Sequence, residues 1–175
     1  GLSGDTQLNG KRWNSVRYTV MSYVGLNGLP LSITQTQAFP VEPMIIDIAA
    51  IQRLYGANPT TNAGDDTYRF EIRNGWPVRA IWDAGGNDTI DGSDQARDLI
   101  IDLSPGGESH GSGFLAGRGA EIHIAFTPVG MDGQIVAEYA SNYIENAIGG
   151  SEAVLGPWIM RHLDRCTRWS VLCTI

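Results

Sequence analysis

Residues 82–91, Trp-Asp-Ala-Gly-Gly-Asn-Asp-Thr-Ile-Asp, join a glycine turn to a short apolar run. The two glycines, Gly85 and Gly86, let the backbone turn tightly, so that carbonyl oxygens can point inward. Asp83 and Asp88 stand on either side of the turn and add carboxylate oxygens. Ca²⁺ binds about six to eight oxygens from groups of these two kinds. The segment therefore predicts a cation-holding turn that leads into a β-strand.

Two further oxygen-rich segments accompany this turn. Residues 62–66, Asn-Ala-Gly-Asp-Asp, lie upstream of it, and Glu145 precedes the segment 146–150, Asn-Ala-Ile-Gly-Gly. Each segment alone is compatible with an ordinary β-turn whose carboxylates are solvated. Three such segments in one acidic chain favour calcium binding over that alternative.

The sequence beyond Pro59 has a pattern typical of β-proteins, because short apolar runs alternate with Gly, Asp and Asn turns. The expected strands are 68–72, 78–82, 89–90, 99–103, 121–126, 134–139 and 143–148. Residues 104–120 are rich in glycine and serine and predict a mobile loop. The alternation predicts a mainly β body over residues 59–151.

The first 58 residues predict one extended segment and one clear helix. Residues 15–24 are β-branched and aromatic, which favours extended backbone. Pro43 is expected in the first helical turn, and Gly56 is expected to end the helix. The helical spacing is carried by Met44, Ile48, Ile51 and Tyr55, flanked by Ile45 and Leu54.

Composition excludes several classes of protein. The 175 residues are 42% hydrophobic and 18% charged, which is typical of a folded domain rather than a disordered chain. The net charge of −7 argues against a general nucleic-acid binder, which needs a basic face. No apolar run reaches 18 residues, so the sequence predicts no membrane span.

Cysteine and histidine positions limit the kinds of site that the chain can form. Cys166 and Cys173 are the only cysteines, so residues 1–165 contain neither a disulfide framework nor a cysteine metal site. The histidines stand far apart, at His110, His123 and His162. They form no His-x-x-x-His pair, which argues against a zinc site built from closely spaced histidines.

Four segments in order resemble the serralysins, calcium-dependent secreted zinc metalloproteases of the metzincin clan. Residues 20–23, Val-Met-Ser-Tyr, resemble the Met-turn of that family, and residues 47–58 resemble the last helix of its protease domain. Residues 81–91 and 144–150 resemble the start of its calcium-binding β-roll. The resemblance implies the end of a protease domain in residues 1–58, a β-roll or β-sandwich domain in 59–151, and an atypical tail in 152–175.

The family implies roles for the matching residues. Met21 would form the floor beneath the zinc, and Tyr23 would ligate zinc or stabilise the oxyanion. One calcium ion would be bound near the carbonyls of Asn62, Gly64 and Asp66, together with Asp83, Gly85 and Asp88. A second calcium ion would be bound by Gly86, Asp88, the Tyr143 carbonyl and Glu145. Asn62 and Asp66 depart from the usual residue types of the family, which ligands acting through carbonyls tolerate.

The chain also departs from the family at both ends. The zinc-binding motif His-Glu-x-x-His is absent from these 175 residues. After residues 149–151, Gly-Gly-Ser, the family continues into Gly-Gly-x-Gly-x-Asp repeats, whereas this chain continues Glu-Ala-Val. An altered reading frame or a gene fragment would explain this change. Residues from Pro157 onward are compatible with a short helix or with disorder.

The resemblance predicts the C-terminal portion of a secreted, extracellular metallopeptidase, with bound calcium and without activity of its own. Zinc and a peptide substrate would belong to the full-length parent. The alternatives are a non-enzymatic calcium or secretion module, an inactive relic, and an acidic β-protein that binds a partner.

Overall fold

The structure, a computed structural model, describes residues 13–25, 40–70, 77–95, 99–111, 120–134, 144–150, 154–155 and 172–174. One helix and nine strands are found in these ranges. They are α1 (Ile45–Tyr55), β1 (Thr67–Arg69), β2 (Val78–Ile81), β3 (Thr89–Asp91), β4 (Ile100–Ile101), β5 (Glu108–His110), β6 (Glu121–Ile124), β7 (Asn146–Ile148), β8 (Val154–Leu155) and β9 (Leu172–Thr174). The predicted mainly β fold with one helix is confirmed for the described residues.

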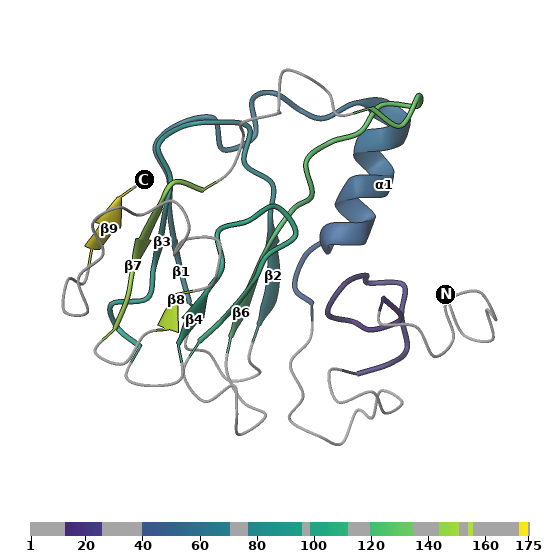
Figure 1. The fold of residues 1–175 in the computed structure, drawn as a ribbon. Coiled ribbons are helices and arrows are strands. Elements are labelled where there is room, and N and C mark those ends of the chain that lie inside the picture. The colour runs from purple at the N-terminus through teal and green to yellow at the C-terminus, as the bar shows by residue number, and fades with distance from the viewer. Residues whose placement is uncertain are drawn as a thin grey trace.

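The strands form two sheets, and the chain passes back and forth between them (Figure 1). The first sheet has the order β1-β3-β7-β9, and the second sheet has the order β2-β6-β5-β4-β8. Strands β1, β3 and β7 run parallel to one another. The hairpin of β5 and β6 lies between β2 and β4 in the second sheet, with β6 parallel to β2. The result is a roll of alternating strands that is widened by one inserted hairpin.

Two hydrophobic clusters hold the layers together. The larger cluster combines residues of both sheets, with Ile90 from the first sheet and Ile81, Ile101 and Ile122 from the second. The smaller cluster lies on the outer face of the second sheet, where Val78 and Ala80 meet residues 44–45 at the start of α1. The second sheet is therefore covered on both faces, by the first sheet and by the N-terminal part of the chain (Figure 1).

The predicted extended segment 15–24 is wrong, because these residues form consecutive turns. The amide of Thr19 donates to the Ser15 carbonyl at 3.2 Å, and the amide of Ser22 donates to the Thr19 carbonyl at 3.4 Å. Hydroxyl groups support the turns, since Met21 N–H donates to Thr19 Oγ1 at 3.1 Å and Val24 N–H donates to Ser22 Oγ at 3.0 Å. Local bonds from side chain to backbone compete here with the β-propensity of the segment.

The helix prediction is correct in position but wrong about Pro43. This residue precedes the N-cap residue Met44 and so lies outside the first turn. The apolar residues at helical spacing are not all buried, because Leu54 is 65% exposed and Tyr55 is 81% exposed. The first half of α1 packs against the second sheet, and farther along the helix Gln52 is buried while the apolar residues near its end are exposed.

The predicted loop 104–120 is wrong in its middle, because Glu108–His110 form β5. This strand pairs antiparallel with β6, and Ser109 on β5 stands opposite Ile122 on β6. The polar composition of the segment conceals a strand that is defined by its pairing with β4 and β6. The expected strand at 134–139, except for Gln134, and the tail from Pro157 to 171 lie outside the described residues. In the part of the chain that the structure covers, no helix has the length and apolar character that crossing a bilayer requires.

Candidate metal centre

Three acidic residues stand side by side at one edge of the first sheet. Asp66, Asp88 and Glu145 each come one position before the first paired residue of β1, β3 and β7, respectively. Because these strands are parallel and in register, the residues before them meet at the same edge. The register of the sheet thus brings together three segments that are far apart in the sequence.

Hydrogen bonds link these acidic residues in a row. The Asp66 amide donates to Asp88 Oδ1 at 2.8 Å, and the Asp88 amide donates to Glu145 Oε2 at 2.7 Å. The carboxylates of Asp88 and Glu145 therefore each accept from the backbone of the neighbouring segment. This pattern fixes both carboxylates relative to the sheet edge.

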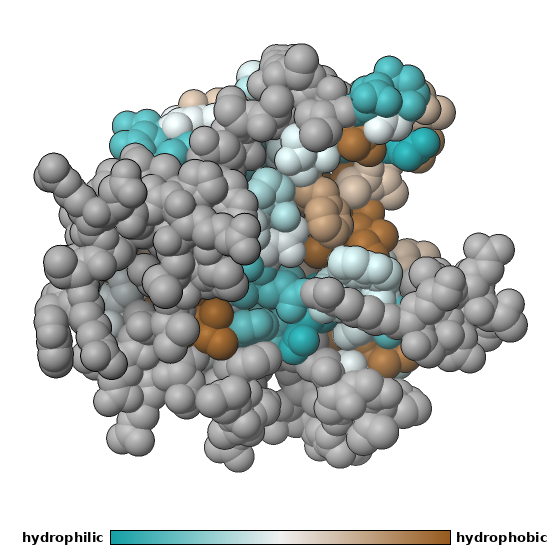
Figure 2. Space-filling model, viewed as in Figure 1, coloured by the Kyte–Doolittle hydropathy of each residue, from teal (hydrophilic) through white to brown (hydrophobic). Residues whose placement is uncertain are grey.

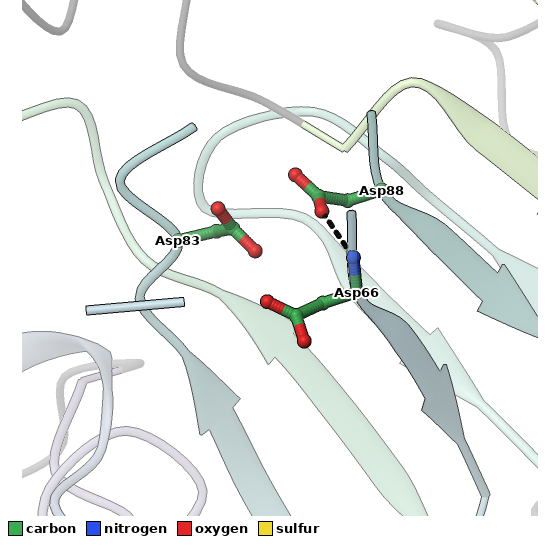
Figure 3. Close-up of side chains that lie close together, drawn as sticks. All are labelled: Asp66, Asp83 and Asp88. Carbon is green, nitrogen blue, oxygen red and sulfur yellow. Dashed lines mark hydrogen bonds between the residues drawn. The ribbon is translucent and has the colours of Figure 1, made fainter. Parts of the chain in front are cut away.

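Asp83 completes the cluster from the turn before β3. One carboxylate oxygen from each of Asp66, Asp83 and Asp88 lies within 4.8 Å of the others. Figure 3 shows the three carboxylates converging on a common space. Among the residues that the structure describes, this is the one group of three acidic or histidine side chains with metal-binding spacing. We call these three residues the aspartate cluster.

Close packing of two loops shapes the aspartate cluster. Gly85 and Gly86 have φ angles of 142° and 150°, which L-residues rarely adopt. A Cβ atom on Gly86 would lie 2.1 Å from the Gly64 carbonyl oxygen and 2.8 Å from Asp88 Oδ1. The turn 83–88 can therefore approach the loop 62–66 only with glycine at this position.

Both oxygens of the Asp83 carboxylate accept hydrogen bonds. The Tyr68 hydroxyl donates to Oδ2 at 2.5 Å, and the Gly85 amide donates to Oδ1 at 2.9 Å. Burial, together with the nearby charge of Asp83, raises the pKa of the Tyr68 phenol. The phenol therefore stays protonated and acts as a donor that orients this carboxylate.

The aspartate cluster concentrates negative charge. Burial is the main cause that raises the pKa of Asp88 to about 7, and the charges of Asp83 and Glu145 add to it. Burial also raises the pKa of Asp83. A cation bound among the three carboxylates would remove their repulsion and favour their ionised forms.

The donor set fits a hard cation. The convergent atoms are carboxylate oxygens, which suit Ca²⁺, whereas thiolate and imidazole ligands suit softer metals. The Asp66 carbonyl, predicted as a ligand, accepts the Thr89 amide at 2.9 Å in the sheet. The Asp66 carboxylate is the group that faces the cluster (Figure 3). Residue 66 thus offers a side-chain oxygen where the sequence predicts a carbonyl oxygen.

The other residues predicted at the metal sites lie outside the aspartate cluster or outside the described residues. Asn62 lies in the upstream loop with a φ of 49°, and its side chain donates to the Trp82 carbonyl at 3.1 Å. Tyr143 lies outside the described residues. Met21 and Tyr23 are 49% and 58% exposed in segment 13–25, which packs on the second sheet, away from the aspartate cluster.

Three supporting residues are not apparent from the sequence. Tyr68 is predicted only as part of a strand, although it orients Asp83. Asp65 Oδ1 accepts the Asn87 amide at 3.0 Å and fixes the glycine turn. Asn146 Nδ2 donates to Asn87 Oδ1 at 2.8 Å and to the Asp88 carbonyl at 3.0 Å. Knowledge of the strand register could have revealed such contacts, but register is not visible in the sequence.

Comparison with known proteins gives a consistent set of relatives. The chain is 34% identical over 145 residues to metallopeptidase AprA of Pseudomonas marginalis, covering 73% of this chain and 30% of that protein. It is 34% identical over 148 residues to a serralysin of Proteus mirabilis, covering 78% and 26%. It is 34% identical over 150 residues to serralysin C of Dickeya chrysanthemi, covering 79% and 27%. No family model matches the chain. The chain thus spans less than a third of the length of these relatives.

Proposed function

Because this chain is a serralysin-type metalloprotease sequence, we propose that residues 59–151 form the calcium-stabilised β-roll of a secreted zinc metallopeptidase. Residues 1–58 would then belong to its protease domain, and residues 152–175 would form an atypical tail. One of these relatives is named a metallopeptidase, which supports metal dependence in the whole protein. The aspartate cluster is the observation that carries the calcium assignment, because its three carboxylates converge within 4.8 Å.

Calcium would bind where the roll begins. Asp83, Asp88 and the Asp66 carboxylate would supply charged ligands, and backbone carbonyls of Asn62, Gly64 and Gly85 would complete the first site. Gly86, Asp88, Glu145 and Tyr143 are the proposed ligands of the second site. The bound ion would supply charge compensation, which would keep the loop 62–66 against the turn 83–88. Since the ion would bind the folded chain preferentially, it would stabilise the fold by mass action.

The residues of this chain do not fit the zinc site of such an enzyme. The sequence contains three separated histidines and no His-Glu-x-x-His motif. We derive no zinc-dependent step from these residues and propose that the chain alone does not hydrolyse peptides. In the whole protein, Met21 would lie beneath the zinc, and Tyr23 would face the peptide substrate. Secretion and the peptide substrate are proposed from the relatives.

A non-enzymatic calcium module is the second candidate. It is favoured by the fact that residues 66–88 alone supply the aspartate cluster, in a sequence that has no His-Glu-x-x-His motif. Such a module would bind calcium and support folding after export. An inactive relic would retain the fold but bind no calcium at physiological concentration.

Calorimetric titration of the pure chain with Ca²⁺, paired with thermal melts in calcium and in chelator, tests the calcium proposal. We expect saturable binding and a rise in Tm on adding calcium, which Asp83→Asn and Asp88→Asn would each abolish. Asp132→Asn is the matched control, because Asp132 lies in an exposed turn before Gly133, where its Oδ1 accepts the Gln134 amide. Absence of binding in the wild type would contradict the calcium proposal and leave an inactive relic or an acidic β-protein that binds a partner. Neither candidate predicts proteolysis by this chain alone, so a protease assay with chelator on the full-length protein separates the enzymatic from the non-enzymatic candidate.

A further inference from the structure

The hairpin of β5 and β6 places four ionisable side chains on the outer face of the second sheet. Glu108 stands opposite His123, and His110 stands opposite Glu121. Cross-strand partners point to the same face, and the intervening Ile122 points to the core between the sheets. Glu121 is 1% exposed and His123 is 0% exposed, although both are polar. The hairpin thus buries a polar group that neither the calcium site nor the hydrophobic core uses.

The turn segment 13–25 covers this polar group. Arg17 Nη2 donates to Glu121 Oε1, and Arg17 Nε lies near Glu121 Oε2, each at 2.9 Å. The Tyr18 hydroxyl donates to Glu108 Oε1 at 2.8 Å. The Tyr18 ring also meets the His123 ring edge-on, with centroids 6.0 Å apart. Two adjacent residues of the segment therefore donate hydrogen bonds to carboxylates on different strands of the hairpin.

We propose that Glu121 and Glu108 are positioning residues that hold segment 13–25 on the second sheet, and that acid loosens this attachment. We call Arg17, Tyr18, Glu108 and Glu121 the charged clasp. The charged clasp needs neither calcium nor zinc, and only the roles of Met21 and Tyr23 within the segment rest on the proposed function.

Hydrogen bonds within the turns connect the charged clasp to the rest of segment 13–25. Tyr18 is three residues from Met21, and the bond from Met21 N–H to Thr19 Oγ1 joins the two regions. On the other side, Asp47 of α1 accepts the Thr19 hydroxyl at 2.6 Å and the Val20 amide at 2.9 Å. A buried charge that loses its partner keeps the full cost of burial. Glu121 also lies 3.1 Å from His123 Nε2, so it stays paired within the hairpin, whereas the partly buried Arg17 would lose this carboxylate. Breaking the Arg17–Glu121 pair therefore favours release of the segment.

Acid sensitivity follows from the groups that surround the clasp. These groups are Arg17 and Tyr18 from the segment, Glu108 and His110 from β5, Glu121 and His123 from β6, and Asp47 from α1, whereas β2 contributes the apolar Val78 and Ala80. Burial, with Arg17 and His123 adding to it, lowers the pKa of His110. Burial alone would raise the pKa of Glu121, but the hydrogen bonds and charges of His123 and Arg17 outweigh burial and lower it. Both groups bind protons more readily once the segment is released, so falling pH favours release.

Hydrogen–deuterium exchange of the pure chain, read by mass spectrometry, tests the clasp. At pH 7.5, Glu121→Gln should speed exchange in segment 13–25 at least tenfold and leave β1 and β3 unchanged. Asp91→Asn is the matched control, because it removes another carboxylate paired with an arginine, in the first sheet. It should leave segment 13–25 at the wild-type rate. If Glu121→Gln does not fold, Tyr18→Phe removes one hydrogen bond and should give a smaller increase in the same segment.

The pH profile separates a positioning role from a general structural one. Between pH 7.5 and 5.5, after correction for intrinsic exchange, wild-type segment 13–25 should lose protection while β1 and β3 keep theirs. His110→Gln should flatten this profile. Wild-type rates in the segment for both clasp variants would overturn the proposal, as would a loss of protection spread evenly over the chain. A flat wild-type profile would overturn the acid sensitivity.

Discussion

The hydroxyl of Tyr68 donates to Asp83 Oδ2 at 2.5 Å, which joins strand β1 to the turn before β3. Tyr68 also packs against the core between the sheets, so its ring is fixed independently of any ion. The carboxylate that we assign to calcium is thus oriented by a side chain that would not touch the ion. Partners that hold a ligand in this way determine how well a metal site is preorganised.

Tyr68→Phe should therefore weaken calcium binding by about 10- to 100-fold, the usual effect of removing a group that orients a metal ligand. The ring and its packing are kept, so the Tm in chelator should change little. Calorimetric calcium titration checks the affinity, and Tyr23→Phe is the control because Tyr23 is 58% exposed and remote from the aspartate cluster. Equal affinities for wild type and Tyr68→Phe, with calcium bound to both, would refute the role of Tyr68 and leave the calcium site intact.

Gly86→Ala should disrupt the contact between the two loops. The added Cβ would lie 2.1 Å from the Gly64 carbonyl oxygen, on a backbone with a φ of 150°. Strain and overpacking of this kind cost about 1–3 kcal/mol each. Gly133→Ala is the matched control, because Gly133 has a φ of 79° and an added Cβ there would meet nothing within 4 Å. Urea unfolding in chelator should show a larger loss of unfolding free energy for Gly86→Ala than for Gly133→Ala. Equal losses would mean that the two loops are not in contact.

In chelator, the titration of the Asp88 carboxyl group should determine how the free energy of unfolding changes with pH. Its pKa is raised to about 7 in the fold, mainly by burial, from an ordinary value of 3.8. A raised carboxyl pKa means that the native state binds the proton more tightly than the unfolded chain. The contribution of Asp88 is thus fully present below the ordinary pKa and is lost as pH rises through about 7.

Chemical denaturation across the range from acid to mildly alkaline pH checks this sign. In chelator, Asp88→Asn should remove the part of the pH dependence of the free energy of unfolding that Asp88 causes. Calcium should reduce the same pH dependence in the wild type. Glu121 and His110 act in the opposite direction at lower pH, since their pKa values are lowered in the fold. Stability in chelator that is equally pH-dependent in Asp88→Asn would show that other groups cause this dependence.

The glycine turn, its two aspartates and the strand that follows could be predicted from the sequence, because these features depend on residues close to one another in the chain. The carboxylate role of Asp66 and the contact of Tyr68 with Asp83 could not. Those contacts depend on the register of β1 against β3, which is set by long-range pairing. The same limitation applies to β5, whose polar residues resemble a loop until β6 is placed beside them.

For segment 15–24 the prediction fails for the opposite reason, because local hydrogen bonds from side chain to backbone outweigh the β-propensity of its residues. Its β-branched residues favour a strand, yet Ser15, Thr19 and Ser22 each use a side-chain oxygen to bind a backbone amide two residues ahead. Short hydroxyl side chains can stabilise turns in this way wherever the chain is not held in a sheet. The hydroxyl spacing is visible in the sequence, but its outcome depends on whether a neighbouring strand competes for the same backbone groups.

The incomplete burial of α1 gives a final prediction. Met44 is 0% exposed and packs with Ile45 against the second sheet, so Met44→Ala should cost about 2–5 kcal/mol in the free energy of unfolding. Leu54 is 65% exposed near the end of the helix, and Leu54→Ala should change stability by no more than about 0.5 kcal/mol. Urea unfolding of both variants in calcium measures the difference. On the side of the molecule where α1 lies, hydrophobic residues are visible at the surface beside hydrophilic ones (Figure 2). A large cost for Leu54→Ala would show that the end of α1 is covered in solution and forms a further packing surface.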